Sequence, residues 1–532
     1  MLAVTYNGKI YNVDVQKMDN ISPSLNNKTH PPSLIQPTSS QSQTNLVLDT
    51  QSPSSNNSAS SPPVLQSNNS APATPQLQIN SALATQRMTE AAIEYNKADQ
   101  AMKKDAVKYG PLYDTGLWGT WFKTYFGGNE NQIPIKKGDF KAYEIINNVE
   151  NSLIDLENIS FKINDKSFAV GDFSCLPLPA LKEKTKKLGA YNNSSKLTYQ
   201  YIPGDISEII SKITEDDIVV VQAASQFNLL EMRAPEITPA KGITGYIQDN
   251  TQGPRVALSS PAGTLFRNYA VWNGTSQINT QINTLIGVMK ELGLELSGNY
   301  DSNGDGSAPA EIGQYSYVNG YLYINPFSIQ DAIKLPTFQK TMDDKLRVGI
   351  QWNTPSIHNP NIKLCQVYSS GLPLGRYLRL IGRGCMIDGI DGVTDDMNID
   401  KFIKVMINEY YPLIKPFAIA LFASTFKCTL QAGVIHALRH GKESCTVYLT
   451  AVGGGVFGNP HEWIKEGLLI ALEEFKNFPL NVKMVWFREK PPQYGDNEFN
   501  KYSKPNSNLQ TGGTRRTQRK QKRSKPTRRI KR

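Results

Sequence analysis

Four glycines within residues 453–458 form the part of this chain best suited to bind a ligand. Without a Cβ atom, backbone N–H groups can approach an anion closely. A β-branched apolar run precedes the glycines and a helix-periodic run follows them, so the loop is predicted to join a strand to the start of a helix. The partial positive charge of a helix start favours phosphate. We therefore predict a phosphate or diphosphate site, with a tight turn that binds nothing as the alternative.

The segment differs from the common nucleotide loops. No Lys-Ser or Lys-Thr pair follows the glycines, and their spacing is not that of a dinucleotide fingerprint. For the helix start, Asn459 is predicted as the N-cap, Pro460 as the first helical residue and Glu462 as the third.

The chain between residues 136 and 495 has the alternating pattern of an α/β domain. Strand-like runs are predicted at 218–223, 364–368, 418–421, 446–452 and 482–487. Helix-like runs are predicted at 281–292, 400–410, 425–439 and 460–475. Alternation of this kind predicts a mainly parallel or mixed sheet covered by helices on both faces, a three-layer arrangement.

The remaining segments differ sharply from this domain. Residues 1–15 predict a β-hairpin around Asn7-Gly8, which would need a protein partner or a docking site. Residues 16–86, rich in Ser, Asn, Pro and Gln, predict a disordered linker. Residues 87–135 predict helical structure with an aromatic face that packs on the main domain or, alternatively, anchors to a partner or a membrane interface. Residues 496–532 predict a disordered basic tail.

The positive charge of the chain lies in that tail. The formal net charge is +10, and residues 515–532 contain eleven Lys or Arg and no acid, so the rest of the chain carries 10 − 11 = −1. These eleven side chains are predicted to contact nucleic acid phosphates without reading bases, or to act as an import signal. They are Arg515, Arg516, Arg519, Lys520, Lys522, Arg523, Lys525, Arg528, Arg529, Lys531 and Arg532.

The cysteines and apolar runs bear on the compartment. Five scattered cysteines without a CxxC pair favour a reducing, intracellular compartment and predict neither a disulfide framework nor a zinc site. No apolar run of 18 residues is present, so we expect no membrane span. His436 and His440 are four residues apart, but a third metal ligand is not identifiable, and we predict no metal site and no cofactor.

The order of helix 425–439, strand 446–452, the GGGVFGNP loop and a last helix resembles the C-terminal half of macro domains. Gly204-Asp205-Ile206 before a strand ending in residues 222–225 resembles their N-terminal half, with a large insertion near 275–360. This resemblance implies binding of ADP-ribose or a related nucleotide diphosphate. It implies that Asp205 accepts a hydrogen bond from the adenine amine and that Phe457 packs against the distal ribose. The phosphates would be bound by N–H groups of Gly453, Gly454, Gly455 and Val456.

Three residues depart from the macro pattern or lie beside it. Ser225 stands where an asparagine linked to hydrolysis is expected, and Asn228 is a possible substitute. Arg267 is expected to pair with a phosphate or, alternatively, to fix its own loop by bonding carbonyl oxygens. Because the asparagine is absent, binding is expected in preference to ADP-ribosyl hydrolysis.

Short segments of the sequence also suggest the kind of organism or virus from which the protein comes. Residues 251–254 and 267–269 resemble a divergent macro-like group of protists, bacteria and large viruses, and the basic tail resembles tails in large DNA viruses of protists. Such an origin would place the protein in the host nucleus or cytoplasm, or in a virion. A competing function is a structural or packaging protein of a virion, with a macro-like scaffold that binds no nucleotide.

Overall fold

The computed structural model describes most of the segment between residues 154 and 486 and a few shorter stretches. The described residues are 2–6, 9–13, 121–130, 154–163, 166–189, 196–235, 237–269, 277, 281–296, 311–375, 386–387, 410–486, 494 and 497–502. The predicted linker at 16–86 and the eleven basic tail residues lie outside them, as does the predicted helix at 400–410.

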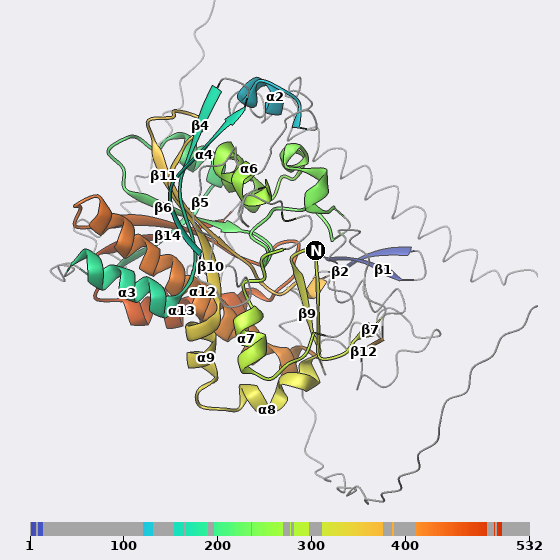
Figure 1. Ribbon diagram of the computed structural model, residues 1–532. Helices are drawn as coiled ribbons and strands as arrows, with labels where there is room; N and C mark the ends of the chain where they lie inside the picture. The colour runs from blue at the N-terminus through green and yellow to red at the C-terminus, as the bar shows by residue number, and fades with distance from the viewer. Residues whose placement is uncertain are drawn as a thin grey trace, which may run out of the picture. The chain divides into compact units, whose positions relative to one another are not determined.

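An eight-stranded mixed sheet forms the centre of the fold (Figure 1). In spatial order its strands are β3 (Ile154–Ile163), β4 (Lys166–Pro177), β10 (Arg347–Pro355), β11 (Lys363–Ser369), β6 (Val219–Ala224), β13 (Cys445–Thr450), β14 (Leu480–Trp486) and β5 (Thr198–Pro203). The last five strands in this order are parallel to one another, whereas β3, β4, β10 and β11 pair antiparallel. The predicted α/β class with a mixed sheet is confirmed.

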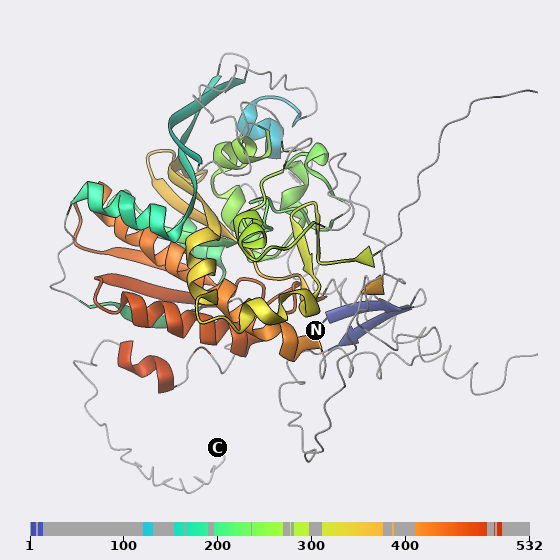
Figure 2. The same ribbon diagram turned by 60° about the horizontal axis from the view of Figure 1, so that its bottom comes forward.

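Helices cover both faces of the sheet. On one face α12 (Tyr411–Arg439) packs on β6 and β13, beside α3 (Leu178–Leu188) and α13 (His461–Phe475). Figure 2 shows α12 and α13 running side by side along the sheet. On the other face, α5 (Gln252–Leu258) packs on β6, and α6 (Pro261–Tyr269) packs on β4 and β10; α4 (Ile206–Ser211) contacts α5.

The period of two along β6 explains why both faces are covered. Val221 and Ala223 are fully buried in the hydrophobic cluster that includes Val256 of α5. Between them, Gln222 points to the other face, where its side-chain amide donates to the Thr429 hydroxyl of α12 at 3.1 Å. Both faces of this strand are therefore interior.

Helix α12 corrects one predicted strand. Residues 418–421 lie inside this 29-residue helix, and the predicted helix at 425–439 is its second half. A short apolar run does not distinguish a strand from a buried helix. Here the apolar residues continue along the chain and lie on all sides of the longer helix, which is buried. In the described part of the chain, α12 is the one helix long and apolar enough to cross a membrane, but 94% of its apolar window is buried inside the protein.

The remaining elements are short. Between residues 281 and 347 they are α7 (Ile286–Glu291), β7 (Glu311–Ile312), β8 (Tyr315–Val318), β9 (Tyr321–Ile324), η5 (Pro326–Ile329), α8 (Gln330–Ile333) and α9 (Phe338–Lys345). Strand β10 also falls within the insertion predicted near 275–360, yet it belongs to the central sheet. Elsewhere the structure has η3 (Pro239–Lys241), η4 (Thr244–Gln248), β12 (Met386–Ile387) and η8 (Asn497–Tyr502).

Three described elements precede β3 along the chain. Strands β1 (Leu2–Tyr6) and β2 (Lys9–Val13) pair antiparallel around residues 7–8. Helix α2 (Trp121–Phe126) buries Trp121, Phe122 and Phe126, and Phe126 packs against Phe168 of β4 with ring centroids 5.1 Å apart. The described part of the aromatic face thus packs on the main domain, the first of the two alternatives.

Candidate functional site at the carboxyl edge of the parallel strands

Loops that follow three neighbouring parallel strands meet at one edge of the sheet. After β6, the Ser225 N–H donates to the carbonyl oxygen of Ser369, at the end of β11, at 2.8 Å. After β11 and β13, Gly371 and Gly453 touch, because a Cβ atom on Gly371 would lie 3.0 Å from the Gly453 Cα. Ligands of open α/β sheets bind at this edge.

The glycine loop has a defined internal structure. The Gly454 N–H donates to the Ala451 carbonyl at 2.9 Å, and the Gly458 N–H donates to the Gly455 carbonyl at 3.0 Å. Gly453 has φ of 77°, a conformation that favours glycine. Its carbonyl accepts hydrogen bonds from both the backbone and the side chain of Asn459, each at 3.0 Å. The loop is therefore a closed turn that needs no ligand to hold it.

Four of its amides remain available: that of Gly453, and three adjacent ones further along the loop. Within the described part of the chain, the N–H groups of Gly455, Val456 and Phe457 donate to no protein acceptor. Gly455 and Val456 are exposed, and a Cβ atom on Gly455 would meet nothing within 4 Å. Of the predicted phosphate ligands, Gly453, Gly455 and Val456 thus keep a free donor among the described residues, whereas the Gly454 donor is used inside the turn.

The predicted N-cap is wrong, for a packing reason. The helix begins at His461, and its N-cap is Pro460, which has no capping side chain. Asn459 is buried, and its side-chain amide donates to the Leu372 carbonyl at 2.7 Å and to Gly453. This amide ties the glycine loop to the loop after β11 and holds the side chain there, while its oxygen, the atom that would cap a helix, has no partner among the described residues.

His461 lies directly beneath the glycine loop. A Cβ atom on Gly454 would fall 2.8 Å from its Cε1 atom. Its Nδ1 atom is 3.2 Å from the Tyr494 hydroxyl, and its Nε2 atom has no partner in the described residues. Burial lowers the pKa of His461 to about 4, so the imidazole is neutral at pH 7.

A tyrosine-rich hairpin joins the glycine loop to the segment after β6. The Tyr321 ring lies 5.5 Å from the Phe457 ring, and its hydroxyl donates to the Met232 carbonyl at 2.9 Å. At the hairpin turn, the Gly320 carbonyl accepts a hydrogen bond from the Phe227 N–H. Phe457 and residues 227–232 are thus connected through β8 and β9.

Asp205, predicted to accept from adenine, has partners of its own. Its side chain caps α4 by accepting from the Ser207 N–H at 2.8 Å and the Ser207 hydroxyl at 2.7 Å. The carboxylate also forms an ion pair with Arg255, and both side chains are at least 90% buried. In this structure the acid stabilises the α4–α5 contact.

Two predicted ligands are interior. Asn228 is fully buried, with its amide bonded to Gln281 at 3.0 Å and its carbonyl oxygen to the Leu230 N–H at 3.1 Å. Arg267 is also fully buried; its guanidinium stacks 3.5 Å above the Tyr368 ring and donates to the Leu229 carbonyl. Arg267 thus bonds a carbonyl of the loop after β6, 38 positions away, and not its own loop, and its Nη1 atom has no partner among the described residues.

Glu231 is the residue that sequence reasoning missed. It is 3% exposed, and burial raises its pKa well above the ordinary value, although Ser225 and the charge of Arg267 act in the opposite direction. Its Oε1 atom has no hydrogen-bond partner among the described residues. A carboxyl group seven residues beyond the end of a parallel strand was a signal, because loops after such strands reach the ligand edge.

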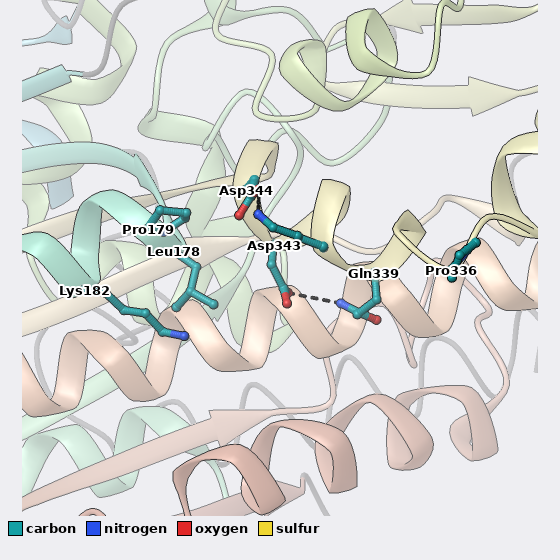
Figure 3. A pocket seen from close by; sticks show the side chains of 8 residues that line it. Leu178, Pro179, Lys182, Pro336, Gln339, Asp343 and Asp344 are labelled. Carbon is teal, nitrogen blue, oxygen red and sulfur yellow. Dashed lines mark hydrogen bonds and ion pairs between the residues drawn. The ribbon is translucent and has the colours of Figure 1, made fainter.

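A pocket of about 490 Å³ opens between α3 and α9 (Figure 3). Its acid Asp343 accepts from Gln339 at 3.1 Å and from Lys427 of α12 at 2.7 Å. Lys427 also pairs with Glu474 at 2.9 Å. None of the glycine-loop residues lines this pocket, and each charged side chain that lines it has an ion-pair partner.

The described residues hold no group of three His, Cys, Asp or Glu side chains placed to bind a metal. His436 and His440 do lie together, with ring centroids 4.6 Å apart. Burial lowers the pKa of His436 to about 3.

The fold, together with the loops at the carboxyl edge of the sheet, defines an α/β protein with a glycine loop at the carboxyl ends of parallel strands. Its similarity to solved structures is to poly(ADP-ribose) glycohydrolases. A mutant from Deinococcus radiodurans in complex with ADP-ribose is 8% identical, with 62% of this chain and 92% of that chain covered and a TM-score of 0.29. The glycohydrolase from Thermomonospora curvata is 12% identical, with 62% and 85% covered and a TM-score of 0.29. A second Deinococcus radiodurans structure with ADP-ribose is 8% identical, with 62% and 93% covered and a TM-score of 0.27.

TM-scores of this size do not establish a shared fold. No protein-family model matches the chain, and no curated protein matches it.

Proposed function

We propose that the chain binds a nucleotide diphosphate of the ADP-ribose type at the glycine loop. The observation that carries this proposal is the set of three unpaired, adjacent amides of Gly455, Val456 and Phe457 at the carboxyl edge of the parallel strands, within the part of the chain that the structure describes. The order α12, β13, glycine loop, α13, β14 supports it, because it is the order on which the macro-domain resemblance rests.

The proposed contacts follow from which loop amides have no acceptor among the described residues. The three amides bind the diphosphate oxygens, as N–H groups converging on an anion do elsewhere. The half-buried Phe457 ring, held against Tyr321, packs against the adjoining sugar. Gly454 acts differently from its neighbours, since its missing side chain makes room for His461.

Calorimetric titration with ADP-ribose tests the proposal, with Gly455→Glu as the main variant. The new carboxylate would stand in open space beside the amides and repel a diphosphate, so we expect affinity to fall by at least tenfold, or about 1.4 kcal/mol. Gly455→Gln is the matched control, with nearly the same shape and no charge, and we expect it to retain most of the affinity. Gly454→Glu is a poorer test because its side chain would overlap His461 and Ile464.

Two results would overturn this proposal. One is a wild-type protein that gains no thermal stability from ADP-ribose; a ligand at one hundred times its Kd adds about 2.7 kcal/mol. The other is equal affinity in the Glu and Gln variants. The first result would leave the competing packaging function, in which the fold binds no nucleotide, and the second would place the nucleotide away from the glycine loop.

A second candidate function is hydrolysis of an ADP-ribosyl bond, favoured by the buried Glu231, whose pKa is raised well above its ordinary value by burial. In this reaction the Glu231 carboxyl gives its proton to the leaving oxygen as the bond to the sugar breaks, and a water molecule adds to that carbon. The water then returns a proton to the carboxylate. We expect Glu231→Gln to abolish hydrolysis while leaving the affinity within about threefold; full activity in this variant would exclude the mechanism.

The basic tail supplies a further proposed partner. Residues 515–532, outside the described residues, would bring the domain to nucleic acid by contacting phosphates.

A further inference from the structure

Helix α2 and the residues after it hold a segment of the main domain by one carboxylate. Glu130 accepts from the Ile243 N–H at 2.8 Å, from the Thr244 N–H at 2.8 Å and from the Thr244 hydroxyl at 2.6 Å. The Tyr269 hydroxyl also donates to it, at 3.1 Å. Four donors from two different segments therefore converge on one side chain.

The backbone around this carboxylate is shaped to receive it. Gly242 has φ of 71°, and a Cβ atom there would lie 2.5 Å from each carboxylate oxygen of Glu130. Only glycine fits at this point. Glu130 and Gly242 thus pack closely against each other, although they lie far apart in the sequence.

Aromatic burial holds the same segment in place. Trp121, Phe122 and Phe126 are at most 2% exposed, and the Trp121 indole N–H donates to the Thr244 carbonyl at 3.0 Å. Thr244 is therefore held through its N–H, its hydroxyl and its carbonyl by residues between 121 and 130. The aromatic rings supply binding area, and Glu130 fixes the position.

One further bond connects this contact to the candidate site. Thr244 begins η4, and Tyr246 in the same turn is 3% exposed. The Tyr246 hydroxyl accepts the N–H of Glu231 at 2.9 Å. A path of direct contacts thus runs from Glu130 through η4 to the backbone of Glu231, whose side chain lies near Ser225 at the end of β6.

We propose that Glu130 is a positioning residue for this site: by fixing η4 it makes the Tyr246 hydroxyl hold the Glu231 backbone, and so sets the loop after β6 beside the ligand edge. This inference rests on the proposed nucleotide site. It assigns a role in ligand binding to residues 121–130. These residues lie about 90 positions or more before β6 and Ser225 along the chain.

The test uses the full chain with Glu130→Ala, Glu130→Gln and an exposed control, Glu157→Gln. Hydrogen–deuterium exchange reads the contact without any ligand. In Glu130→Ala we expect the Ile243 and Thr244 amides to exchange at least about tenfold faster and the Glu231 amide to follow them, because opening of η4 removes its acceptor. The control is expected to match the wild type at all three amides. Faster exchange at Ile243 and Thr244 with an unchanged Glu231 amide would overturn the proposal.

Chemical rescue separates positioning from general loss of stability. Glu130→Ala leaves room for acetate among the four donors, and Glu130→Gln retains one acceptor oxygen. We expect ADP-ribose affinity to fall about tenfold in the Ala variant and less in the Gln variant, and acetate, but not chloride at equal ionic strength, to restore it. Equal affinity in wild type and Glu130→Ala would overturn the positioning role. If the wild type binds no ADP-ribose, the proposed function fails, while the exchange measurement still tests the contact.

Discussion

Gly253 of α5 lies against the carboxyl group of Glu231 with no room for a side chain between them. A Cβ atom on Gly253 would overlap both Oε2 of Glu231 and the carbonyl oxygen of Ala224 at the end of β6. Helix α5 can pack on β6 only because this residue is glycine. The same contact shuts one side of the Glu231 carboxyl off from water, which is part of why burial raises its pKa.

The first prediction concerns this glycine. We expect Gly253→Ala to lower the free energy of unfolding by about 2–3 kcal/mol, because overpacking forces α5 away from the strand. Gly245→Ala is the matched control, since a Cβ atom there meets nothing within 4 Å. Urea denaturation of both variants makes the comparison, and an equal midpoint for the two would contradict the tight packing of α5 on β6.

The second prediction concerns acid stability. Burial holds the pKa of His461 at about 4 in the folded chain, against an ordinary value of 6.5. Between these two values the unfolded chain binds a proton that the folded chain does not, so stability is lost as the pH falls through this window. His461→Gln removes the group, and we expect the variant to lose about 2–3 kcal/mol less than the wild type between pH 7.5 and 4.

Unfolding free energies at the two pH values provide the measurement. His436, whose pKa is lowered to about 3, contributes its own loss in both proteins and so cancels in the comparison. Identical pH dependence in wild type and variant would show that His461 is not buried as described.

The third prediction concerns the lysine beside the pocket of Figure 3. Lys427 is 6% exposed and pairs with Asp343 at 2.7 Å and Glu474 at 2.9 Å. Lys427→Met leaves two carboxylates facing each other, and we expect a loss of about 3 kcal/mol of unfolding free energy.

Lys182→Ala is the matched control for Lys427→Met. Lys182 pairs with the same Glu474 at 2.7 Å, but its side chain is 46% exposed. We expect a loss below about 1 kcal/mol, because solvent screens exposed pairs. Equal losses in the two variants, measured by thermal or urea unfolding, would contradict a buried role for Lys427.

The fourth prediction concerns the tail. A chain ending at residue 514 lacks eleven Lys or Arg, and we expect its affinity for double-stranded DNA to fall and its salt dependence to flatten. For every phosphate that the shortened chain no longer neutralises, the plot of log K against log salt becomes less steep by about 0.9. Filter binding at several salt concentrations measures this, and an unchanged slope would place DNA binding elsewhere on the protein.

Sequence patterns placed four of the eight strands of the sheet correctly, because period and β-branching are local signals. The strands predicted at 218–223, 364–368, 446–452 and 482–487 correspond to β6, β11, β13 and β14. Prediction failed at 418–421, where four apolar residues in a buried helix look like a strand. It also failed at Asn459, whose cap pattern is local but whose side chain is used by Leu372, 87 positions away.

That a glycine loop joins a strand to a helix at residues 453–458 could be predicted without a structure, because neighbours along the chain are enough to specify that turn. Which polar groups are free to face a ligand depends on how distant segments pack together. Arg267 and Asn228 look equally available in the sequence, yet both are fully buried and bonded inside the protein. Glu231 and Glu130 look ordinary, yet each is placed by segments far away along the chain. The physical reason is that burial and hydrogen-bond partners depend on contacts between distant segments, which no local pattern encodes.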